Sequence, residues 1–480
     1  MEKILNLIGG QHVLPASGRF LDNVDPSTGE VYSLIPDSDQ RDVADAVTAA
    51  RAAFPVWSGM AAEKRAAVLN KMADLIDRDW KVLAAAESRD NGKTLKLAST
   101  LDIPRASANI RFFASGIQHF ASEAHLTGSE AVNYTIRAPW GVAGCISPWN
   151  LPLYLFTWKI APALAAGCTV VAKPSELTPM TAYLFSHYAE EAGMPAGALN
   201  IVHGSGSSAG QAIVEHPDVA GISFTGGTVT GRKIAATAAP MFKKLSLELG
   251  GKNPNIVFAD CDFEKTVQQS VRAAFTNQGE ICLCGSRIFV EAALYEKFVA
   301  AFVQETSRLR VGNPADDSTD LGPLVTAAHR QKVEGYIALA LEEGGTIAFG
   351  GRRPQVDGLP NGFFLEPTVI TGLSHHCRTN QEEIFGPVVT IMPFQTEAEA
   401  LEYANSTTYG LAATVFTENL SRAHRMAAQI RSGIIWINCW LYRDLRTPFG
   451  GMKQSGVGRE GGWEALRFFT EAKNVCIKLP

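Results

Sequence analysis

The sequence predicts an α/β protein built on a doubly wound, mostly parallel sheet. From about residue 140, short strand-like runs alternate with helical segments, an order typical of parallel sheets with crossover helices. These runs are apolar almost throughout, as expected for strands that are covered on both faces. A second α/β series follows between about residues 250 and 440, so two α/β domains are expected in the 480 residues.

The first third of the chain is predicted to be mainly helical. Apolar residues recur at helical spacing in Asp42 to Phe54 and Ala61 to Glu87, and Pro55 and the region around Gly59 are expected to separate these helices. The first α/β series predicts strands at 141–147, 169–173, 199–203 and 221–225, and helices at 178–192 and 209–216. The second predicts strands at 255–259 and 286–290, and helices at 264–277 and 293–309.

The C-terminal segment 474–479 is predicted to form an isolated strand. It has no local partner, and such strands often complete a sheet elsewhere in the chain or in another subunit. Residues 130–137 alternate polar and apolar side chains and are a candidate partner. We therefore expect these two segments to contribute to oligomerisation.

Composition is that of a soluble globular protein: 46% of residues are hydrophobic, 19% are charged and the net charge is −5. This charge argues against a nucleic-acid partner, which normally requires a basic patch. No apolar run is long enough to span a membrane, and the N-terminus lacks a signal-peptide core, so a cytoplasmic location is expected. The eight cysteines show no zinc-site spacing, so no metal is predicted, and most should be small buried residues.

Three polar residues stand at positions suited to catalysis. Cys282 lies in a polar, glycine-containing stretch after a predicted helix and is a candidate nucleophile, although a structural role is equally compatible with this segment alone. Glu248 ends an apolar strand before Gly-Gly, either as a general base or as an exposed strand-end residue. Asn150 follows the strand 141–147, either as an oxyanion donor or as a turn former.

Two glycine-rich segments are candidates for binding a nucleotide. Residues 203–210 and 224–231 each follow a strand and open a helix, where backbone N–H groups can meet a diphosphate. Neither has the strict G-x-G-x-x-G spacing. Lys173 and Glu176, at the end of another strand, could hold ribose hydroxyls, and a carboxylate there favours NAD over the 2′-phosphate of NADP.

Taken together, six motifs resemble those of the aldehyde dehydrogenase superfamily, in the order and spacing of that family and across essentially the whole chain. They are PWN (148–150), KPSE (173–176), FTGGT (224–228), LELGGK (247–252), NQGEIC (277–282) and EEIFGPV (382–388). The resemblance implies an aldehyde dehydrogenase fold: an NAD-binding domain of residues 1–119 and 141–249, a catalytic domain of 250–445, and a small β oligomerisation element of 120–140 and 463–480. The resemblance also implies a homodimer or a homotetramer, the assemblies that members of this family commonly form.

The resemblance also implies roles for individual residues. Cys282 matches the nucleophile, whose thiolate adds to the aldehyde; Asn150 and the Cys282 backbone N–H match the oxyanion donors; and Glu248 matches the base that activates water against the thioester. The implied cofactor contacts are Trp149, Lys173, Glu176, Gly206, Gly210, Gly226, Gly227, Leu249, Glu383 and Phe385. One departure is Gly227, where the family commonly has serine, which removes one hydroxyl donor beside the diphosphate.

Two segments narrow the resemblance to the dehydrogenases of 2-aminomuconate and 2-hydroxymuconate 6-semialdehyde. They are 101–115 and 438–462. These substrates carry a carboxylate remote from the aldehyde, and an arginine fork binds a carboxylate bidentately. Arg105 and Arg443 match the arginines of that subgroup; the alternatives are a helix-surface salt bridge for Arg105 and a loop ion pair for Arg443. Arg446 is expected to share this work, and Phe449 and Trp158 to line the apolar channel.

Other functions remain open at this level. A broader aldehyde dehydrogenase for another aliphatic or aromatic aldehyde is the main alternative, and the amino and hydroxy semialdehydes are not distinguished. A CoA-acylating enzyme is disfavoured because Glu248 is present. A non-catalytic NAD-binding structural protein is disfavoured because Cys282, Glu248 and Asn150 are all present, whereas thiol esterase activity is compatible as a side reaction.

Overall fold

The computed structural model describes residues 1–480, and its largest sheet is the predicted doubly wound one. Its strands lie in the order β20 (Gly456–Val457), β12 (Lys244–Glu248), β11 (Val219–Thr225), β8 (Val142–Ile146), β9 (Thr169–Lys173), β10 (Leu199–Ile201), β2 (Asn6–Ile8) and β3 (Gln11–Val13). The five strands from β12 to β10 are parallel. The chain runs from β8 outwards to β10 and then returns to β11 on the other side of β8. Ligands of doubly wound sheets bind where the order reverses, here beyond the ends of β8 and β11.

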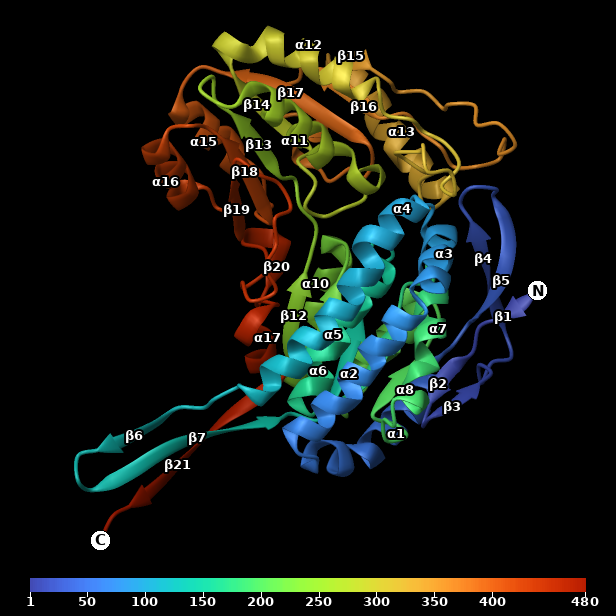
Figure 1. Ribbon diagram of the computed structural model, residues 1–480, viewed down its shortest axis with the longest axis vertical. Helices are drawn as coiled ribbons and strands as arrows, with labels where there is room; N and C mark the ends of the chain where they lie inside the picture. The colour runs from blue at the N-terminus through green and yellow to red at the C-terminus, as the bar shows by residue number, and fades with distance from the viewer.

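The second α/β series forms a separate seven-stranded sheet. Its order is β15 (Thr346–Phe349), β16 (Thr368–Thr371), β17 (Val388–Phe394), β14 (Arg287–Glu291), β13 (Pro254–Val257), β18 (Ala412–Phe416) and β19 (Ile434–Ile437). Only the edge strand β15 is antiparallel to its neighbour. This sheet and its helices form the upper part of the molecule in Figure 1, above the eight-stranded sheet.

Helices cover both sheets. Beside the first sheet lie α1 (Gln40–Gly59), α2 (Ala62–Arg78), α3 (Trp80–Asn91), α4 (Leu95–Leu97), η1 (Ala98–Asp102), α5 (Ile103–Gln118), α6 (Pro152–Ala166), α7 (Met180–Ser186), α8 (Tyr188–Glu191), η2 (Gly206–Gly210), α9 (Gln211–Glu215), α10 (Thr228–Ala238), η3 (Ala239–Met241), η6 (Lys453–Ser455) and α17 (Gly462–Phe468). The others are α11 (Phe263–Phe275), η4 (Thr276–Gly279), η5 (Ala292–Leu294), α12 (Tyr295–Thr306), α13 (Ala327–Glu342), α14 (Arg378–Gln381), α15 (Glu397–Asn405) and α16 (Leu420–Gln429). None of them combines the length and apolar character that crossing a bilayer requires.

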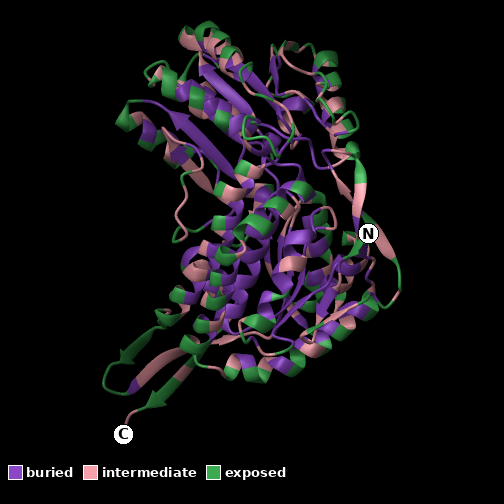
Figure 2. Cartoon of the chain, turned by 45° about the vertical axis from the view of Figure 1, so that its right-hand side comes forward, coloured by how far each residue is buried: buried purple, intermediate pink, exposed green.

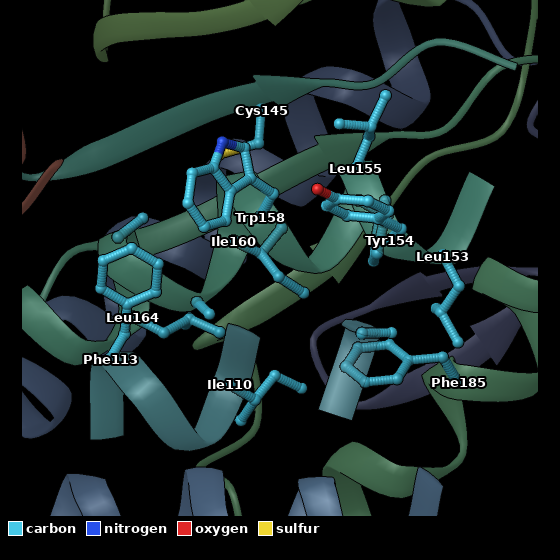
Figure 3. Close-up of a cluster of buried hydrophobic side chains, with 14 of the residues drawn as sticks. Ile110, Phe113, Cys145, Leu153, Tyr154, Leu155, Trp158, Ile160, Leu164 and Phe185 are labelled. Atoms are coloured by element: carbon cyan, nitrogen blue, oxygen red, sulfur yellow. The ribbon is translucent and has the colours of Figure 1, made fainter. Parts of the chain in front are cut away.

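The largest hydrophobic core surrounds α6, in which every residue is buried. A helix that is apolar on all sides must be enclosed by other elements. Helices α2 and α5 and the sheet strands enclose it, and Figure 3 shows Ile110 and Phe113 of α5 facing Ile160 and Leu164. Figure 2 shows this buried interior continuing through both sheets. The core fixes α5 and α6 relative to each other, and both carry residues of the site described below.

The helical prediction for the first third is wrong in three places. Residues 2–36 form short strands, β1 (Glu2–Lys3), β2, β3, β4 (Phe20–Asp25) and β5 (Glu30–Pro36). The predicted helix 61–87 breaks at Asp79, whose carboxylate is held by Arg78 and by the Tyr188 hydroxyl. Helix α1 continues through Pro55, because Trp57 is fully buried and its Nε1–H donates to the Leu164 carbonyl at 3.0 Å. The predicted helix 178–192 is likewise divided at His187 into α7 and α8.

The C-terminal strand pairs with the predicted partner segment, and it does so within its own chain. Strand β21 (Thr470–Lys478) lies antiparallel to β7 (Ala131–Pro139), which also pairs with β6 (Ala124–Thr127). Figure 1 shows these three strands projecting from the body as an arm that ends at the C-terminus, and Figure 2 shows that the arm is mostly exposed or half-buried. Its role in oligomerisation, and the functional labels of the domains, stay predictions.

Candidate active site

Cys282 lies where two pockets meet. It follows η4 in the loop that leads to β14. One pocket, of about 310 Å³, is mainly apolar and is lined by α5, α6 and residues near 441–449; the other, of about 230 Å³, lies at the ends of β8 and β11. Cys282, Thr225 and Leu249 line both pockets. The Cys282 sulfur therefore lies between the pocket at the expected nucleotide position and the mainly apolar pocket.

The loop that carries Cys282 is held in an unusual backbone conformation. Asn277, Gln278 and Gly279 all have positive φ, at 53°, 55° and 71°. Conformations of this kind cost energy for non-glycine residues and persist only where the surroundings impose them. A Cβ on Gly279 would lie 2.2 Å from the Gly386 carbonyl oxygen. This loop can therefore pack against the segment 382–388 only with glycine at position 279.

Asn253 holds the loop that carries Cys282 through hydrogen bonds. Its Nδ2 donates to the carbonyl oxygens of Cys282 at 2.7 Å and of Cys284 at 2.9 Å. Its Oδ1 accepts from the Ala412 backbone N–H at 3.0 Å. One buried amide therefore joins the Cys282 loop to β18 and fixes the position of the sulfur.

Asn150 reaches the Cys282 side of the pocket from the end of β8. Its Nδ2 donates to the Glu280 carbonyl at 2.9 Å, which leaves the second N–H of the amide free for another acceptor. The backbone carbonyl of Asn150 accepts from Lys93 Nζ at 3.0 Å and from Asn277 Nδ2 at 3.1 Å. The amide is 3% exposed and lines the pocket at the ends of β8 and β11 together with Cys282. This geometry suits a fixed donor to an oxyanion.

Glu248 ends β12 and is buried without a hydrogen-bond partner on either carboxylate oxygen. It lines the apolar pocket, and a Cβ on Gly450 would lie 2.7 Å from its Oε1. Burial, followed by the negative charge of Glu460, raises the pKa of Glu248 well above its usual value. Glu460 itself is held by Lys159 Nζ at 2.8 Å and by Ser223 Oγ at 3.1 Å. A carboxylate with a raised pKa and free oxygens is suited to accept a proton.

The surroundings of Cys282 favour its thiol over its thiolate. Burial, and then the charges of Glu383 and Glu248, raise the pKa of Cys282 to about 12, with Arg443 opposing them. Attack on a carbonyl by the thiolate therefore requires an acceptor for the thiol proton.

Six of the predicted cofactor contacts line the second pocket. They are Trp149, Gly226, Gly227, Leu249, Glu383 and Phe385, joined by His329 and Lys332, which were not predicted. A Cβ on Gly226 would lie 2.4 Å from the Phe224 ring, whereas Gly227 faces open space at the uncapped N-terminus of the eleven-residue helix α10. Free N–H groups at such a terminus suit an anionic diphosphate. Phe385 has a φ of 64°, and its carbonyl lies 2.7 Å from His329 Nε2.

The other four predicted cofactor contacts form a cluster at the end of β9. Lys173 Nζ pairs with Glu176 Oε2 at 2.9 Å, and the Gly206 N–H donates to Glu176 Oε1 at 3.1 Å. A Cβ on Gly210 would touch the Lys173 side chain at 3.5 Å. Burial opposes ionisation of Glu176, but Lys173 and backbone N–H groups outweigh it and lower its pKa. The ionised carboxylate is suited to accept hydrogen bonds from hydroxyl groups.

The apolar pocket brings Arg105, Arg443 and Phe449 together with Cys282 and Glu248. Neither Arg105 nor Arg443 forms an ion pair, unlike Arg446, so the two salt-bridge alternatives are not realised. Arg443 instead lies 4.1 Å from the Phe449 ring and 5.5 Å from the Trp158 ring.

Two of the looser predictions for this pocket are wrong. Arg446 is bound to Asp444 at 2.6 Å and is 81% exposed, so it does not reach the pocket. Trp158 is buried behind Arg443 and does not line the pocket either. No group of three or more histidine, cysteine or acidic side chains is arranged to hold a metal ion.

Known proteins match this arrangement over nearly the whole chain. The model of the aldehyde dehydrogenase family matches residues 13–475. The chain belongs to this family. A 2-aminomuconic semialdehyde dehydrogenase of Danio rerio is 52% identical over 98% of both chains, and a 2-hydroxymuconic semialdehyde dehydrogenase of Pseudomonas sp. (strain CF600) is 48% identical over the full length of both. The NAD⁺ complex of an aldehyde dehydrogenase from Bacillus cereus is 39% identical, covers 100% of this chain and 97% of its own, and has a TM-score of 0.97. The aldehyde dehydrogenase fold predicted from the motifs is thereby confirmed.

Several residues of this aldehyde dehydrogenase site had no role in the sequence-based hypothesis. They are Asn253, Glu460 and Tyr154, which lie beside predicted residues, and Lys159, which holds Glu460. Asn253 directly follows the motif LELGGK, and Glu460 lies within the segment 438–462. Their roles depend on contacts such as Lys159 with Glu460, which are 301 residues apart. The one available signal was that charged residues such as Lys159 stand in otherwise apolar runs, where charge is rarely buried without a partner.

Proposed function

We propose that this chain oxidises a carboxylate-bearing semialdehyde, 2-aminomuconate or 2-hydroxymuconate 6-semialdehyde, to the acid with NAD as hydride acceptor. The observation that carries the proposal is the position of Cys282 between a pocket with free helix N–H groups and an apolar pocket with two unpaired arginines. The names of the relatives from Danio rerio and Pseudomonas support the same substrates.

The first half of the mechanism uses Cys282 and Asn150. Glu248, with its free oxygens and raised pKa, takes the thiol proton, directly or through water, and the sulfur adds to the aldehyde carbon. The Asn150 amide and the Cys282 backbone N–H stabilise the oxyanion of the thiohemiacetal. Expulsion of the carbonyl-carbon hydride then leaves a thioester on Cys282.

The second half uses Glu248 again. After releasing the thiol proton to solvent, Glu248 accepts a proton from water, whose oxygen attacks the thioester. Collapse of the adduct releases the carboxylic acid, and the proton held by Glu248 returns to the sulfur to restore the thiol. Glu460, held by Lys159 and Ser223, contributes a negative charge that helps to raise the pKa of Glu248. Because this base is present, hydrolysis is favoured over transfer of the acyl group to CoA.

NAD supplies the hydride acceptor when it is bound. Trp149, Leu249, Glu383 and Phe385 would hold its nicotinamide side, Gly226 and Gly227 its diphosphate, and Lys173, Glu176, Gly206 and Gly210 its adenine ribose. The Glu176 carboxylate suits a ribose hydroxyl and repels a 2′-phosphate, which favours NAD over NADP. The NAD⁺ complex of the similar aldehyde dehydrogenase from Bacillus cereus supports the same cofactor.

A substrate profile tests the proposal. NADH formation is measured with both muconic semialdehydes and with 2,4-hexadienal, a neutral conjugated aldehyde of the same chain length. We expect the carboxylated substrates to have a kcat/KM about 10²-fold higher or more, because each arginine–carboxylate contact contributes a charged hydrogen bond. Equal values would favour the alternative, an aldehyde dehydrogenase of broader specificity.

The Arg105→Ala, Arg443→Ala double variant should lose this preference, and Arg446→Ala is the matched control, because Arg446 is paired to Asp444 outside the pocket. A double variant that retained the wild-type preference would place the carboxylate elsewhere.

The same proposal includes a homodimer or homotetramer and a cytoplasmic location. It also includes three domains: an NAD-binding domain of residues 1–119 and 141–249, a catalytic domain of 250–445, and an oligomerisation element of 120–140 and 463–480.

A further inference from the structure

Tyr154 lies between the two arginines of the apolar pocket. Arg443 Nη1 donates to its hydroxyl oxygen at 2.9 Å, and the Arg105 guanidinium lies 5.6 Å from its ring centre. Tyr154 lines the pocket with both arginines and with Cys282. Figure 3 shows it on α6 beside Trp158, one helical turn away. Tyr154 is therefore a neighbour of both unpaired cations.

The hydrogen bonds of Tyr154 leave one donor unused. A phenol has a single O–H donor and can also accept. Here the oxygen accepts from Arg443, and no protein atom accepts the hydroxyl proton. Since arginine has no acceptor, this hydroxyl proton cannot return to Arg443 and is available to a group in the pocket.

The position of Tyr154 is fixed by its backbone. Its carbonyl accepts from Asn109 Nδ2 and from Thr157 Oγ1, both at 3.0 Å. Asn109 lies on α5 one turn after Arg105, so the same bond that ties α5 to α6 also sets the spacing between Arg105 and Tyr154. The ring is only 5% exposed, which restricts it further. The hydroxyl is therefore a preorganised donor.

We propose that Tyr154 is a specificity-determining residue whose hydroxyl, beside Arg105 and Arg443, donates the third hydrogen bond to the substrate carboxylate. This inference rests on the proposed carboxylated substrate. A carboxylate accepts several hydrogen bonds on its two oxygens, and two guanidinium groups leave part of that capacity unused. The bond received from Arg443 polarises the phenol and makes it a stronger donor.

The test is Tyr154→Phe, which removes one oxygen atom and keeps the ring. For 2-hydroxymuconic 6-semialdehyde we expect kcat/KM to fall about tenfold or more, mainly through KM, because a contact remote from the aldehyde acts on ground and transition states alike. For 2,4-hexadienal we expect a change of less than about twofold, since it offers no carboxylate. Activity towards 2,4-hexadienal also shows that the variant is folded. Tyr188→Phe, which removes a buried hydroxyl bound to Asp79, is the matched control and should change neither value.

A double-mutant comparison separates direct donation from support of Arg443. In the Arg443→Ala background, Tyr154→Phe should still lower kcat/KM for the carboxylated substrate by about threefold or more, because the donor itself is lost. No further loss in that background would overturn the inference and make Tyr154 a positioning residue for Arg443. If Tyr154→Phe keeps the wild-type preference for the carboxylated substrate, the inference about Tyr154 is overturned as well, whereas the proposed function is unaffected. A wild type that does not prefer the carboxylated substrate would overturn both.

Discussion

The two pockets that meet at Cys282 are built from different parts of the chain. The pocket at the ends of β8 and β11 is shaped by backbone: a Cβ on Gly226 would collide with Phe224, and a Cβ on Gly250 would lie 2.2 Å from Glu383 Oε2. The apolar pocket is shaped by side chains of α5, α6 and the segment 441–449, such as Arg105, Tyr154 and Phe449. The pocket at the ends of β8 and β11 therefore requires glycine at these positions, whereas the apolar pocket is defined by the side chains that line it.

This difference separates the chemistry from the choice of substrate. The pocket at the ends of β8 and β11 tolerates little substitution at Gly226 and Gly250, because a Cβ at either position would collide with Phe224 or with Glu383. A pocket formed by side chains on two packed helices changes its specificity with single substitutions and without movement of the core. In the proposed mechanism, Cys282 and Glu248 carry out the chemistry with every aldehyde, and Arg105 and Arg443 select the substrate.

Cys282→Ala should have the largest effect, because it affects the function of both pockets. Loss of the nucleophile is expected to lower NADH formation about 10⁴-fold or more with every aldehyde. NAD binding, followed by calorimetry, should remain within a few-fold of the wild type, since the pocket is otherwise intact. Cys284→Ala is the control, because this buried cysteine lines neither of the two pockets and its sulfur hydrogen-bonds to the Thr276 carbonyl. Near-normal NADH formation in Cys282→Ala would exclude a covalent mechanism.

Glu248→Gln should slow both halves of the reaction. Loss of the base is expected to slow steady-state turnover by about 10²- to 10³-fold with carboxylated and neutral aldehydes alike. Because Glu248 is the proposed acceptor of the Cys282 proton, rapid mixing should show no burst of NADH. A full burst, equal to the concentration of sites and followed by slow turnover, would show that Glu248 acts only in thioester hydrolysis and that another group accepts the Cys282 proton.

Glu176→Gln should act on the cofactor side alone. Removing the charge is expected to raise the KM for NAD about tenfold, because charged hydrogen bonds to the ribose are lost, and to narrow the preference over NADP. The KM for the semialdehyde should not move, since Glu176 and the arginines belong to separate parts of the site. Glu190→Gln, an exposed carboxylate on α8, is the control. An equal rise in both KM values would mean that the two pockets are coupled.

The sequence predicts most of the sheet and the main site residues because their signals are local. The predicted strand 169–173 coincides with β9, and Asn150, Glu248 and Cys282 follow recognisable strand or loop motifs. Motif spacing reports backbone requirements, such as the closeness of Gly279 to Gly386, that are the same wherever the fold occurs.

The remaining features could not be predicted because they depend on contacts between distant segments. Asp79 ends a helix through its bond to Tyr188, 109 residues away, and Glu460 is held by Lys159, 301 residues away. The strands within residues 2–36 contain two to seven residues each, too few for a reliable period. Tyr154 occupies an apolar helix where the sequence gives no sign of two neighbouring cations.

The smallest expected effect concerns the charges that the two pockets place around Cys282. Because the pKa of this thiol is raised to about 12, its alkylation by iodoacetamide should increase with pH through the neutral range without a plateau, by about tenfold per unit. Removing a nearby negative charge lowers the pKa, so Glu383→Gln should react a few-fold faster at pH ~8. Glu248→Gln should instead react more slowly, because the proposed acceptor of the thiol proton is lost. Arg443→Ala removes a positive charge and should react a few-fold more slowly.

The direction of change in Glu248→Gln decides between two roles of the same carboxylate. Faster alkylation means that its charge acts on the sulfur only by repulsion, so that the thiol proton leaves by another route. Slower alkylation means that Glu248 takes this proton itself, and that loss of the acceptor outweighs relief of the repulsion. Because Glu383 lies on the cofactor side and is not a candidate base, Glu383→Gln isolates the repulsive effect and provides the reference for this comparison.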